Sequence, residues 1–278
     1  MDLIVTLQCK DQPGIVHAMT TAVLSAKGNI IENQQFTDPL TSDFVMRTRF
    51  ETKLELGEVK RILNSGLDHF KPKLQIRSLD QQKRVLILVT KESHCLRDLL
   101  YLQELGELPI EIAAVVSNHQ DLKALVESHN IKFIDQSTLD KKPAETQISN
   151  LVDELQIDLI VLARYMQILT KELCEQMFGR IINIHHSFLP GFKGAKPYHQ
   201  AHSRGVKIIG ATAHFVTPDL DEGPIIDQDV AHVTHAATPE DLIATGRDIE
   251  RRVLSRAVRD FAQDRIFIVG DKTVVFHN

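Results

Sequence analysis

The chain has 278 residues, of which 43% are hydrophobic and 25% are charged, with a formal net charge of −5. This length allows one large domain or two ordinary ones, and the acidic balance gives no indication of a nucleic-acid or anionic-membrane partner. No apolar run approaches the ~20 residues that a membrane span needs. The three cysteines, Cys9, Cys95 and Cys174, are widely spaced and lack CxxC patterning. We therefore expect a protein of the reducing cytoplasm.

Residues 1–80 are predicted to form a βαββαβ unit, which is the ferredoxin-like split arrangement. Alternating apolar residues indicate the strands, and apolar residues at helical spacing indicate the helices. Turn residues separate these elements, including a Pro-Gly pair at 13–14 and a glycine at 28. The expected strands are 3–9, 29–36, 43–50 and 74–79, and the expected helices begin near residue 15 and span 56–70.

This first segment resembles an ACT domain. The resemblance is carried by Asp-Gln-Pro-Gly-Ile-Val at 11–16 and by Gly-Asn-Ile at 28–30. It implies a regulatory domain with a small-molecule site, often for an amino acid, where N–H groups at a helix start suit a carboxylate. A tight turn in a module that only pairs through its sheet is an equal alternative, and either reading favours a homo-oligomer. The candidate effector-binding residues are Asp11, Pro13, Gly14, Asn29 and Ile30.

A polar, charged linker at 80–84 precedes the second predicted domain, which we place at residues 84–278. The continuous apolar run at 85–89 is typical of a strand that is buried on both faces. Strands and helices then alternate as far as residue 163, which predicts a mostly parallel, doubly wound α/β sheet. Ligands of such sheets bind beyond the carboxyl ends of the strands. The loops of interest are therefore 90–95, 117–120, 163–170 and 183–194.

Two of these loops give limited information by themselves. The loop at 90–95 contains no glycine, so we expect no nucleotide phosphate there. The loop at 163–170 mixes apolar bulk with polar ends, which suits a flat heteroaromatic ligand. From its residues alone, however, core packing is the favoured interpretation of the second loop.

The stretch 183–192 follows an apolar run and ends in Pro-Gly, so a strand is expected to end and a loop to begin there. Side chains two positions apart on an extended backbone point the same way, so Asn183 and His185 can face one pocket. An amide can hold an oxyanion, and an imidazole can move a proton. Asp221, on an acidic loop closed by Gly-Pro, could fold over the strand end and orient His185. The three suit acyl transfer or acyl hydrolysis, and no GxSxG motif indicates a serine nucleophile.

Three motifs in order resemble the formyltransferase fold that uses 10-formyltetrahydrofolate. They are Asn-Ile-His-His-Ser-Phe-Leu-Pro at 183–190, Gly-Ala-Thr-Ala-His-Phe-Val at 210–216 and Leu-Asp-Glu-Gly-Pro-Ile-Ile at 220–226. With the ACT-like segment in front, the whole chain resembles the formyltetrahydrofolate deformylase family. This resemblance implies hydrolysis of 10-formyltetrahydrofolate to formate and tetrahydrofolate. The reaction would supply formate for purine synthesis and balance the one-carbon folate pools.

The resemblance also implies roles for particular residues. It implies that Asn183, His185 and Asp221 are catalytic. It also implies that the loop after residue 163 and the loop around residue 221 bind the pterin through backbone contacts. It thereby replaces the core-packing interpretation of 163–170. The substrate-binding residues that follow from it are Met166, Gln167, Leu169, His186, Gly194, Glu222 and Gly223.

Two departures from related enzymes bear on the acceptor of the formyl group. Glycinamide ribonucleotide formyltransferases carry a glycine-rich phosphate loop after the first strand and a proline after the catalytic histidine. This chain has 91–95 without glycine and His186 at those places. Both departures favour water as the acceptor. Formyl transfer to an amine such as glycinamide ribonucleotide is the alternative activity, and an inactive amino-acid sensor is the non-enzymatic alternative.

Histidines cluster between residues 185 and 235, which makes a metal hydrolase another alternative. No HxxEH or HExxH spacing occurs, and His232 with His235 makes a weak pair. We therefore expect no metal and no separate cofactor, since the folate is itself the substrate.

Overall fold

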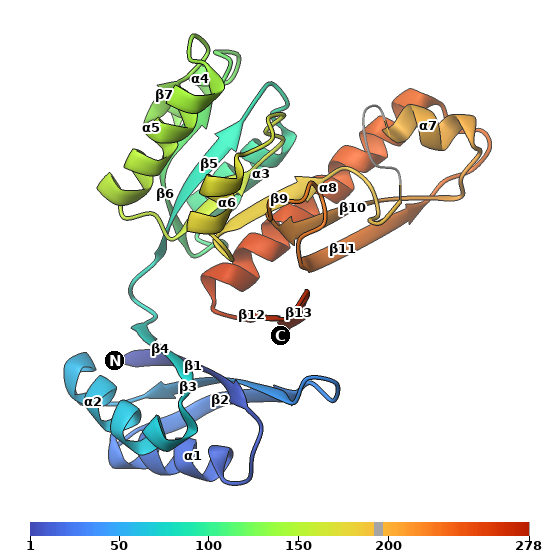
Figure 1. Cartoon of the computed structure of the whole chain (residues 1–278). Coiled ribbons are helices and arrows are strands. Elements are labelled where there is room, and N and C mark those ends of the chain that lie inside the picture. Colours follow the sequence, from blue (N-terminus) through green and yellow to red (C-terminus); the bar gives the residue numbers. More distant parts are fainter. Residues whose placement is uncertain (192–196, 278) are drawn as a thin grey trace. The chain divides into compact units, whose positions relative to one another are not determined.

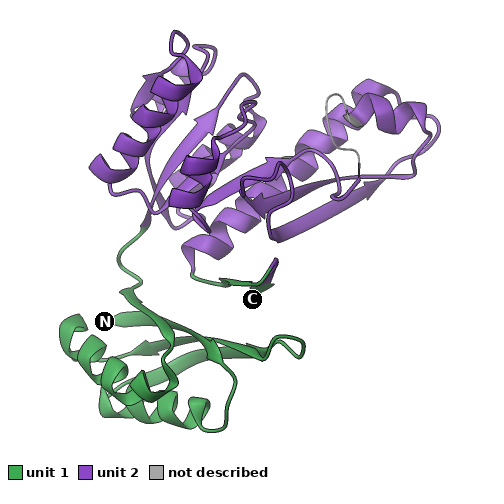
Figure 2. Ribbon diagram, in the orientation of Figure 1, with its two compact units in different colours: residues 1–82, 264–270, 274–278 green, residues 83–263, 271–273 purple. Residues whose placement is uncertain are grey.

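The computed structural model describes residues 1–191 and 197–277 and divides the chain into two compact units (Figures 1 and 2). Among the described residues, no helix is long and apolar enough to cross a lipid bilayer. The predicted linker contains the boundary between the units. Unit 1 comprises Met1–Gln82, Asp264–Gly270 and Val274–Asn278, and unit 2 comprises Lys83–Gln263 and Asp271–Thr273.

Unit 1 contains a four-stranded antiparallel sheet and two helices, which confirms the βαββαβ prediction. The strand order is β2-β3-β1-β4. Alternating apolar side chains of the central strands pack with the apolar stripes of the helices in one core. The elements are β1 (Asp2–Lys10), α1 (Ile15–Ser25), β2 (Asn29–Thr37), β3 (Asp43–Glu51), α2 (Leu56–Leu67), a 3-10 turn (Asp68–Phe70) and β4 (Lys73–Ser78).

The central strand β3 is buried on both faces. One face belongs to the core with the helices, and Val45 on the other face packs against Phe267 and Val269. These two residues belong to the C-terminal hairpin, which lies within the range 84–278 that was predicted as the second domain. The structure instead groups 264–270 and 274–278 with unit 1, because they cover this second face (Figure 2). The hairpin consists of β12 (Ile266–Val269) and β13 (Lys272–Val275).

Unit 2 contains a seven-stranded sheet in the order β11-β10-β9-β8-β5-β6-β7. Strands β9, β8, β5, β6 and β7 are parallel to one another, whereas β10 is antiparallel to β9 and β11 is antiparallel to β10. This confirms the prediction of a mostly parallel, doubly wound sheet. The elements are β5 (Lys83–Val89), α3 (His94–Glu104), β6 (Ile110–Ser117), α4 (Lys123–Ser128), β7 (Phe133–Asp135), α5 (Lys141–Glu154), β8 (Leu159–Leu162), α6 (Lys171–Gln176), β9 (Ile181–His185), α7 (Pro197–Ser203), β10 (Ile208–Phe215), β11 (Ile225–His232) and α8 (Pro239–Ala262).

Two helical layers enclose the parallel part of this sheet. Leu86 and Leu88 of β5 share a core with side chains of α5 and α6, whereas Val85 and Ile87 point to the opposite face. Helices α3 and α8 pack together, and α8 also packs on β9, β10 and β11. The chain leaves β5 toward β6 and later returns to β8 on its other side. The switch point of the sheet, where ligands bind in such folds, therefore lies between β5 and β8.

Helix α8 begins as its sequence predicts. Thr238 Oγ1 accepts a hydrogen bond from the Asp241 N–H at 3.2 Å, and the Asp241 carboxylate accepts one from the Thr238 N–H at 2.9 Å. Pro239 occupies the first helical turn, where its missing N–H costs nothing. Helix α7 likewise begins at a proline, Pro197. The short helix α6 was not predicted, because six residues are too few to show helical periodicity.

Candidate active site

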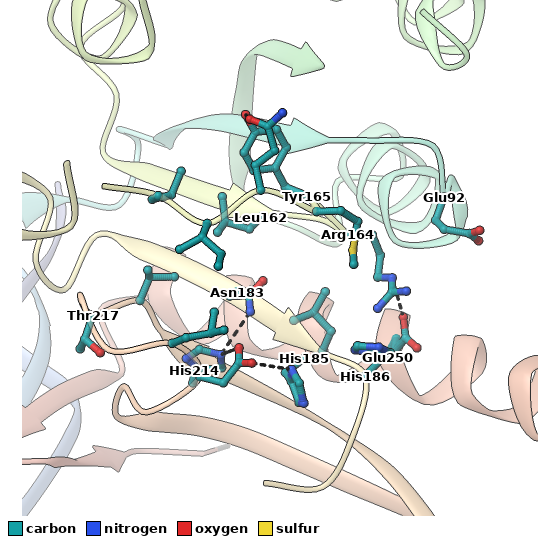
Figure 3. A pocket seen from close by; sticks show the side chains of 18 of the residues that line it. Glu92, Leu162, Arg164, Tyr165, Asn183, His185, His186, His214, Thr217 and Glu250 are labelled. Carbon is teal, nitrogen blue, oxygen red and sulfur yellow. Dashed lines mark hydrogen bonds and ion pairs between the residues drawn. The ribbon is translucent and has the colours of Figure 1, made fainter. Parts of the chain in front are cut away.

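A cavity of about 570 Å³ lies in unit 2 at the carboxyl ends of β8 and β9 (Figure 3). Its volume is in the range of small-molecule sites. The wall is built by the start of α3, the loop after β8, the end of β9, the loop after β10, and parts of α7 and α8. Three of the four predicted loops contribute to it. The loop at 117–120 is not among the described lining residues.

The end of β9 supplies two of the predicted catalytic side chains. The strand continues to His185, so Asn183 and His185 are two of its last three residues and do not lie at the start of a loop, as the sequence had suggested. Both line the cavity, as expected for side chains two positions apart on a strand. Asn183 is partly buried, and His185 is buried. A strand fixes these groups more firmly than a loop would.

His214 holds the carboxamide of Asn183 from the neighbouring strand. The two residues are direct partners in the antiparallel pairing of β9 and β10, and Asn183 Nδ2 lies 3.2 Å from His214 Nε2. His214 Nδ1 lies 2.8 Å from the Phe215 carbonyl oxygen, which can only accept, so Nδ1 carries the proton. In the neutral ring, Nε2 then accepts from Asn183. The second amide N–H of Asn183 remains for a ligand.

The loop after β10 is shaped to deliver Asp221 to this place. Asp221 has a φ of +56°, a left-handed conformation that aspartate tolerates better than most residues. The Phe215 N–H donates to the Pro224 carbonyl at 2.9 Å, which closes the loop on the strand. Gly223 lies so close to that strand that an added Cβ would be 1.8 Å from the Phe215 carbonyl oxygen. Glycine at position 223 is therefore needed for the position of the loop.

Asp221 connects the two imidazoles. Its Oδ2 lies 3.3 Å from His185 Nδ1, and its Oδ1 lies 3.6 Å from His214 Nε2. Hydrogen bonding to His185 holds the pKa of the Asp221 carboxyl well below its usual value. The group is therefore an anion at neutral pH. Asn183, His185 and Asp221, far apart in the sequence, are brought together through His214.

The free edge of the His185 ring faces the cavity. Its Nδ1 is engaged by Asp221, while Nε2 is buried and has no hydrogen-bond partner among the described side chains and backbone. A buried ring nitrogen without a partner is costly, so a ligand or water is expected to bind it. An acid that fixes one nitrogen of a histidine also decides which form of the ring meets the substrate. His185 is thus placed to transfer a proton at Nε2.

Gly223→Ala should lower the reaction rate without unfolding the protein. The added methyl group cannot occupy its ideal position beside Phe215, so the loop must move and carry Asp221 away from His185. A displacement of about 1 Å at a catalytic group can cost about 100-fold in rate. Steady-state kinetics beside a thermal melt measure both effects. Gly57→Ala, which meets nothing within 4 Å in α2, is the matched control, and a fully active Gly223→Ala enzyme would contradict this account.

His186, the next residue, is a neutral imidazole at the cavity wall. Burial, together with the positive charge of Arg164, lowers the pKa of His186 to about 4. Its ring centroid lies 5.1 Å from that of His185. The predicted contact with substrate is possible from this position, whereas proton donation by a protonated His186 near neutral pH is disfavoured.

The predicted folate-binding residues divide into two groups. Met166, Gln167 and Leu169 line the cavity. Core packing was the wrong interpretation for Met166, which is 61% exposed, but it holds for Leu169, which is buried in the core of the sheet. The Met166 N–H already donates to Thr90 Oγ1 at 3.0 Å, so it is not a free backbone donor. Glu222 is not among the lining residues, nor is the loop-shaping glycine beside it. Gly194 lies outside the described residues.

One cluster in the described part of the chain has the composition of a metal site. Ligand atoms of His94, Cys95 and Glu250 lie within 4.8 Å of one another. However, Arg164 Nε is 3.5 Å from Glu250, and a neighbouring cation opposes a second positive charge. Burial raises the pKa of the Cys95 thiol well above its usual value, which opposes thiolate ligation. These residues fit a hydrogen-bonded ion pair better than a metal centre.

The predicted effector residues of unit 1 do not form one site within a single chain. Asp11 and Gly14 follow the carboxyl end of β1, and Gly14 precedes α1 with a φ of +99°. Asn29 starts β2 and pairs with Glu51, which in turn pairs with the first residue of β1. The two groups are thus separated by the length of a nine-residue strand, roughly 25–30 Å. The sequence could not show this separation, because the two motifs were assigned to one site only through the resemblance to an ACT domain.

Residues 83–258 match the model of the family described as formyl transferase. The formyltetrahydrofolate deformylase of Escherichia coli strain K12 is 45% identical over 271 residues, which cover 96% of this chain and 95% of that protein. The formyltetrahydrofolate deformylase of Bacillus subtilis strain 168 is 43% identical, and the alignment covers 98% of this chain and 92% of that protein. These similarities include both units.

Solved structures give the same result and add a more distant relative. The crystal structure of formyltetrahydrofolate deformylase from Burkholderia mallei has a TM-score of 0.95 and 43% identity, and 99% of each chain is covered. Glycinamide ribonucleotide transformylase 1 from Symbiobacterium toebii has a TM-score of 0.67 and 29% identity, covering 73% of this chain and 97% of that one. The second structure is thus similar to only part of this chain.

Proposed function

The chain belongs to the formyltetrahydrofolate deformylase family, and on that premise we propose that it hydrolyses 10-formyltetrahydrofolate to formate and tetrahydrofolate. The apolar part of the cavity, from Met166 to Leu169 and from Val216 to Leu220, suits the flat pterin. The formyl group then lies beside the ends of β9 and of the Asp221 loop. We also propose that the formate supplies purine synthesis and that the reaction balances one-carbon folate pools.

One observation carries this proposal. An amide, an imidazole and a carboxylate on the wall of the cavity form a connected unit, with separations of 3.2 Å from Asn183 to His214, 3.6 Å from His214 to Asp221 and 3.3 Å from Asp221 to His185. The amide offers an N–H, the imidazole offers a proton at Nε2, and the carboxylate stays ionised. These are the three functions that addition of water to a formyl group requires.

In the proposed first step, Asp221 orients a water molecule toward the formyl carbon. The water oxygen forms a bond to that carbon, and the carbonyl oxygen gains negative charge. The free N–H of Asn183 and the protonated Nε2 of His185 stabilise this oxyanion. Asp221 remains an anion throughout, so it also stabilises the positive charge of His185.

In the proposed second step, the tetrahedral intermediate collapses and the bond from carbon to N10 breaks. His185 gives its Nε2 proton to the departing N10, and the proton of the attacking water replaces it on His185. Tetrahydrofolate and formic acid result, and formic acid ionises to formate. The same imidazole therefore serves both bond changes.

The direct test is to incubate the purified protein with 10-formyltetrahydrofolate and measure formate and tetrahydrofolate together. We expect equal amounts of both products without an added acceptor. Tetrahydrofolate that appears without formate would indicate transfer to another molecule. The absence of both products, with folded protein and a bound folate, would exclude the proposed activity.

We further propose that the reaction needs no metal ion. The chemistry assigned above is complete with side chains and water, and the His94–Cys95–Glu250 cluster contains Arg164 as its cation. Incubation with a chelator followed by gel filtration should leave the rate of formate release unchanged. Loss of activity that returns with one added metal would refute this proposal.

For unit 1, we propose an effector role, with an amino acid bound near the loop before α1, and assembly into a homo-oligomer. Strand β2 is an edge of its sheet, and Ile31 and Phe36 on it are exposed, which supports pairing with a second copy. Calorimetry with amino acids and light scattering address the two parts separately. The free, buried cysteines are compatible with the cytoplasmic location that we also propose.

A further inference from the structure

The two ends of the cavity differ in chemistry. The end assigned to folate is mainly apolar, whereas the opposite end, beyond His185 and His186, carries charged groups. Figure 3 shows Arg164, His186 and Glu250 together on the side away from Thr217. If folate fills the apolar end and its formyl group lies at His185, the charged end is the space where an acceptor larger than water would have to fit. The residues that line this end are Glu92, His94, Arg164, Tyr198, Arg247 and Glu250.

A buried carboxylate organises the charged end. Glu250 is 1% exposed and accepts a hydrogen bond from Tyr198 Oη at 2.7 Å. Its other oxygen lies 2.8 Å from His94 Nε2 and 3.5 Å from Arg164 Nε. Burial alone would raise the pKa of Glu250, but His94, Arg164 and Tyr198 together lower it below its usual value. The result is a fixed anion that joins the start of α3, the loop after β8, α7 and α8.

Tyr198 is held in this network from two sides. Its hydroxyl binds Glu250, and its ring lies on Gly246 in the middle of α8, where an added Cβ would be 2.1 Å from the tyrosine oxygen. Glycine inside a helix is destabilising relative to alanine. A glycine at this place in a 24-residue helix is explained by the seat that it provides for the ring. Burial, together with the charge of Glu250, raises the pKa of Tyr198, so it remains a neutral donor.

The rings of His185, His186 and Tyr198 follow one another along the wall of the cavity. The centroid of the Tyr198 ring lies 6.2 Å from that of His186, whose centroid is 5.1 Å from that of His185. The phenol therefore forms part of the wall of the acceptor end next to the reacting centre. The groups around it already bind one another and are poorly placed to bind a second substrate.

We propose that Tyr198, seated on Gly246 and held by Glu250, is the residue that restricts the acceptor to water. This inference rests on the proposed deformylase activity. An amine that entered in place of water would attack the formyl carbon and form a new C–N bond as the bond to N10 breaks. Its proton would pass to N10, and the products would be a formylated amine and tetrahydrofolate. Glycinamide ribonucleotide transformylase, by its name, serves such an acceptor on a similar fold.

The experiment compares the partition of the formyl group in Tyr198 variants with glycinamide in excess. Formylglycinamide and formate are quantified by mass spectrometry, and uncatalysed transfer is subtracted. Tyr198→Ala should raise the ratio of formylglycinamide to formate at least about tenfold, because opened space in a pocket changes selectivity by that order. Tyr198→Phe keeps the ring and should leave the ratio near that of the unmodified protein.

A second variant tests the seat independently. Gly246→Ala displaces the ring while leaving Tyr198 in the sequence, so it should also raise the ratio. Tyr101→Ala, at a tyrosine of α3 that is 58% exposed, is the matched control and should not. All variants are compared by circular dichroism and thermal melting.

Folded Tyr198→Ala or Gly246→Ala enzymes with an unchanged ratio would overturn the proposal. A folded Tyr198→Ala enzyme that has lost both reactions would also overturn it, because Tyr198 would then serve catalysis itself. If Tyr198→Ala does not fold, the Gly246→Ala ratio decides. A failure of the unmodified protein to release formate would instead count against the proposed function.

Discussion

Replacing Asp221 by asparagine should lower kcat for formate release by about 10²–10⁴-fold, the range of a lost acid–base function. The amide keeps the size of the carboxylate but removes the charge that faces His185 Nδ1 at 3.3 Å. It can also present an N–H to the ring, which favours the wrong tautomer. Because the side chain is not in the folate end of the cavity, KM should change little. Steady-state kinetics on the two proteins give both constants.

The pH profile distinguishes a catalytic role of Asp221 from a structural one. Its folded pKa is depressed, so the stability contributed by the ionised form is complete above the unfolded pKa and is lost only as the pH falls through the folded value. Between about pH 8 and pH 5, Asp221 therefore stays ionised in the unmodified protein. Any loss of rate in that interval belongs to another group. A well-folded Asp221→Asn enzyme with near-normal kcat would remove Asp221 from the mechanism.

Much of the fold follows from local patterns in the sequence. The apolar run at 85–89 predicts a strand that is covered on both faces, and β5 is one. Thr238, Pro239 and Asp241 predict the start of α8, and the structure shows the complete capping box. Such features depend only on neighbouring residues, so they can be recognised without knowledge of tertiary contacts.

Features that depend on the pairing of distant segments could not be predicted in this way. His214 is one of several residues of β10 whose side chains point to the same face of the sheet. Only the register of β9 with β10 places it opposite Asn183. Glu250 lies in an amphipathic helix and resembles a surface residue, yet helices α3 and α7 bury it. A charged residue next to the apolar stripe of α8 was the available signal. It is ambiguous, because most such residues are solvated.

The candidate site shows the same division. The spacing of Asn183 and His185 predicted that they share a face, because strand geometry fixes alternation. The approach of Asp221 to His185 could not be predicted in this way. It depends on the path of the loop, which is set by Gly223 and by the left-handed conformation of Asp221, and neither feature shows from the sequence where the loop leads. The two stretches of unit 1 that carry the ACT resemblance are separated by a strand length, which no local pattern indicates.

Asn183→Ala should lower kcat by about 10²–10³-fold with a small change in KM, as expected for loss of one oxyanion donor. The amide is aligned by His214 at 3.2 Å, so His214→Ala should also slow the reaction, though by less. If His214 acts mainly by holding this amide, removing it from the Asn183→Ala enzyme should cost less than removing it from the unmodified protein. The kinetics of the two single variants and the double variant measure that difference.

The effect of His214→Ala that remains in the Asn183→Ala enzyme shows whether His214 has a second role. Its Nε2 is also 3.6 Å from Asp221 Oδ1, so a part of its effect should persist in the Asn183→Ala background. Full additivity would mean that His214 does not act through the amide, and the assignment of Asn183 as an aligned donor would fail. Strong non-additivity, with melting temperatures within about 4 °C of one another, would instead place the carboxamide, the two imidazoles and the carboxylate in one cooperative unit. Such a unit explains how a site assembled from two strands and a loop can hold a single water molecule in position for attack.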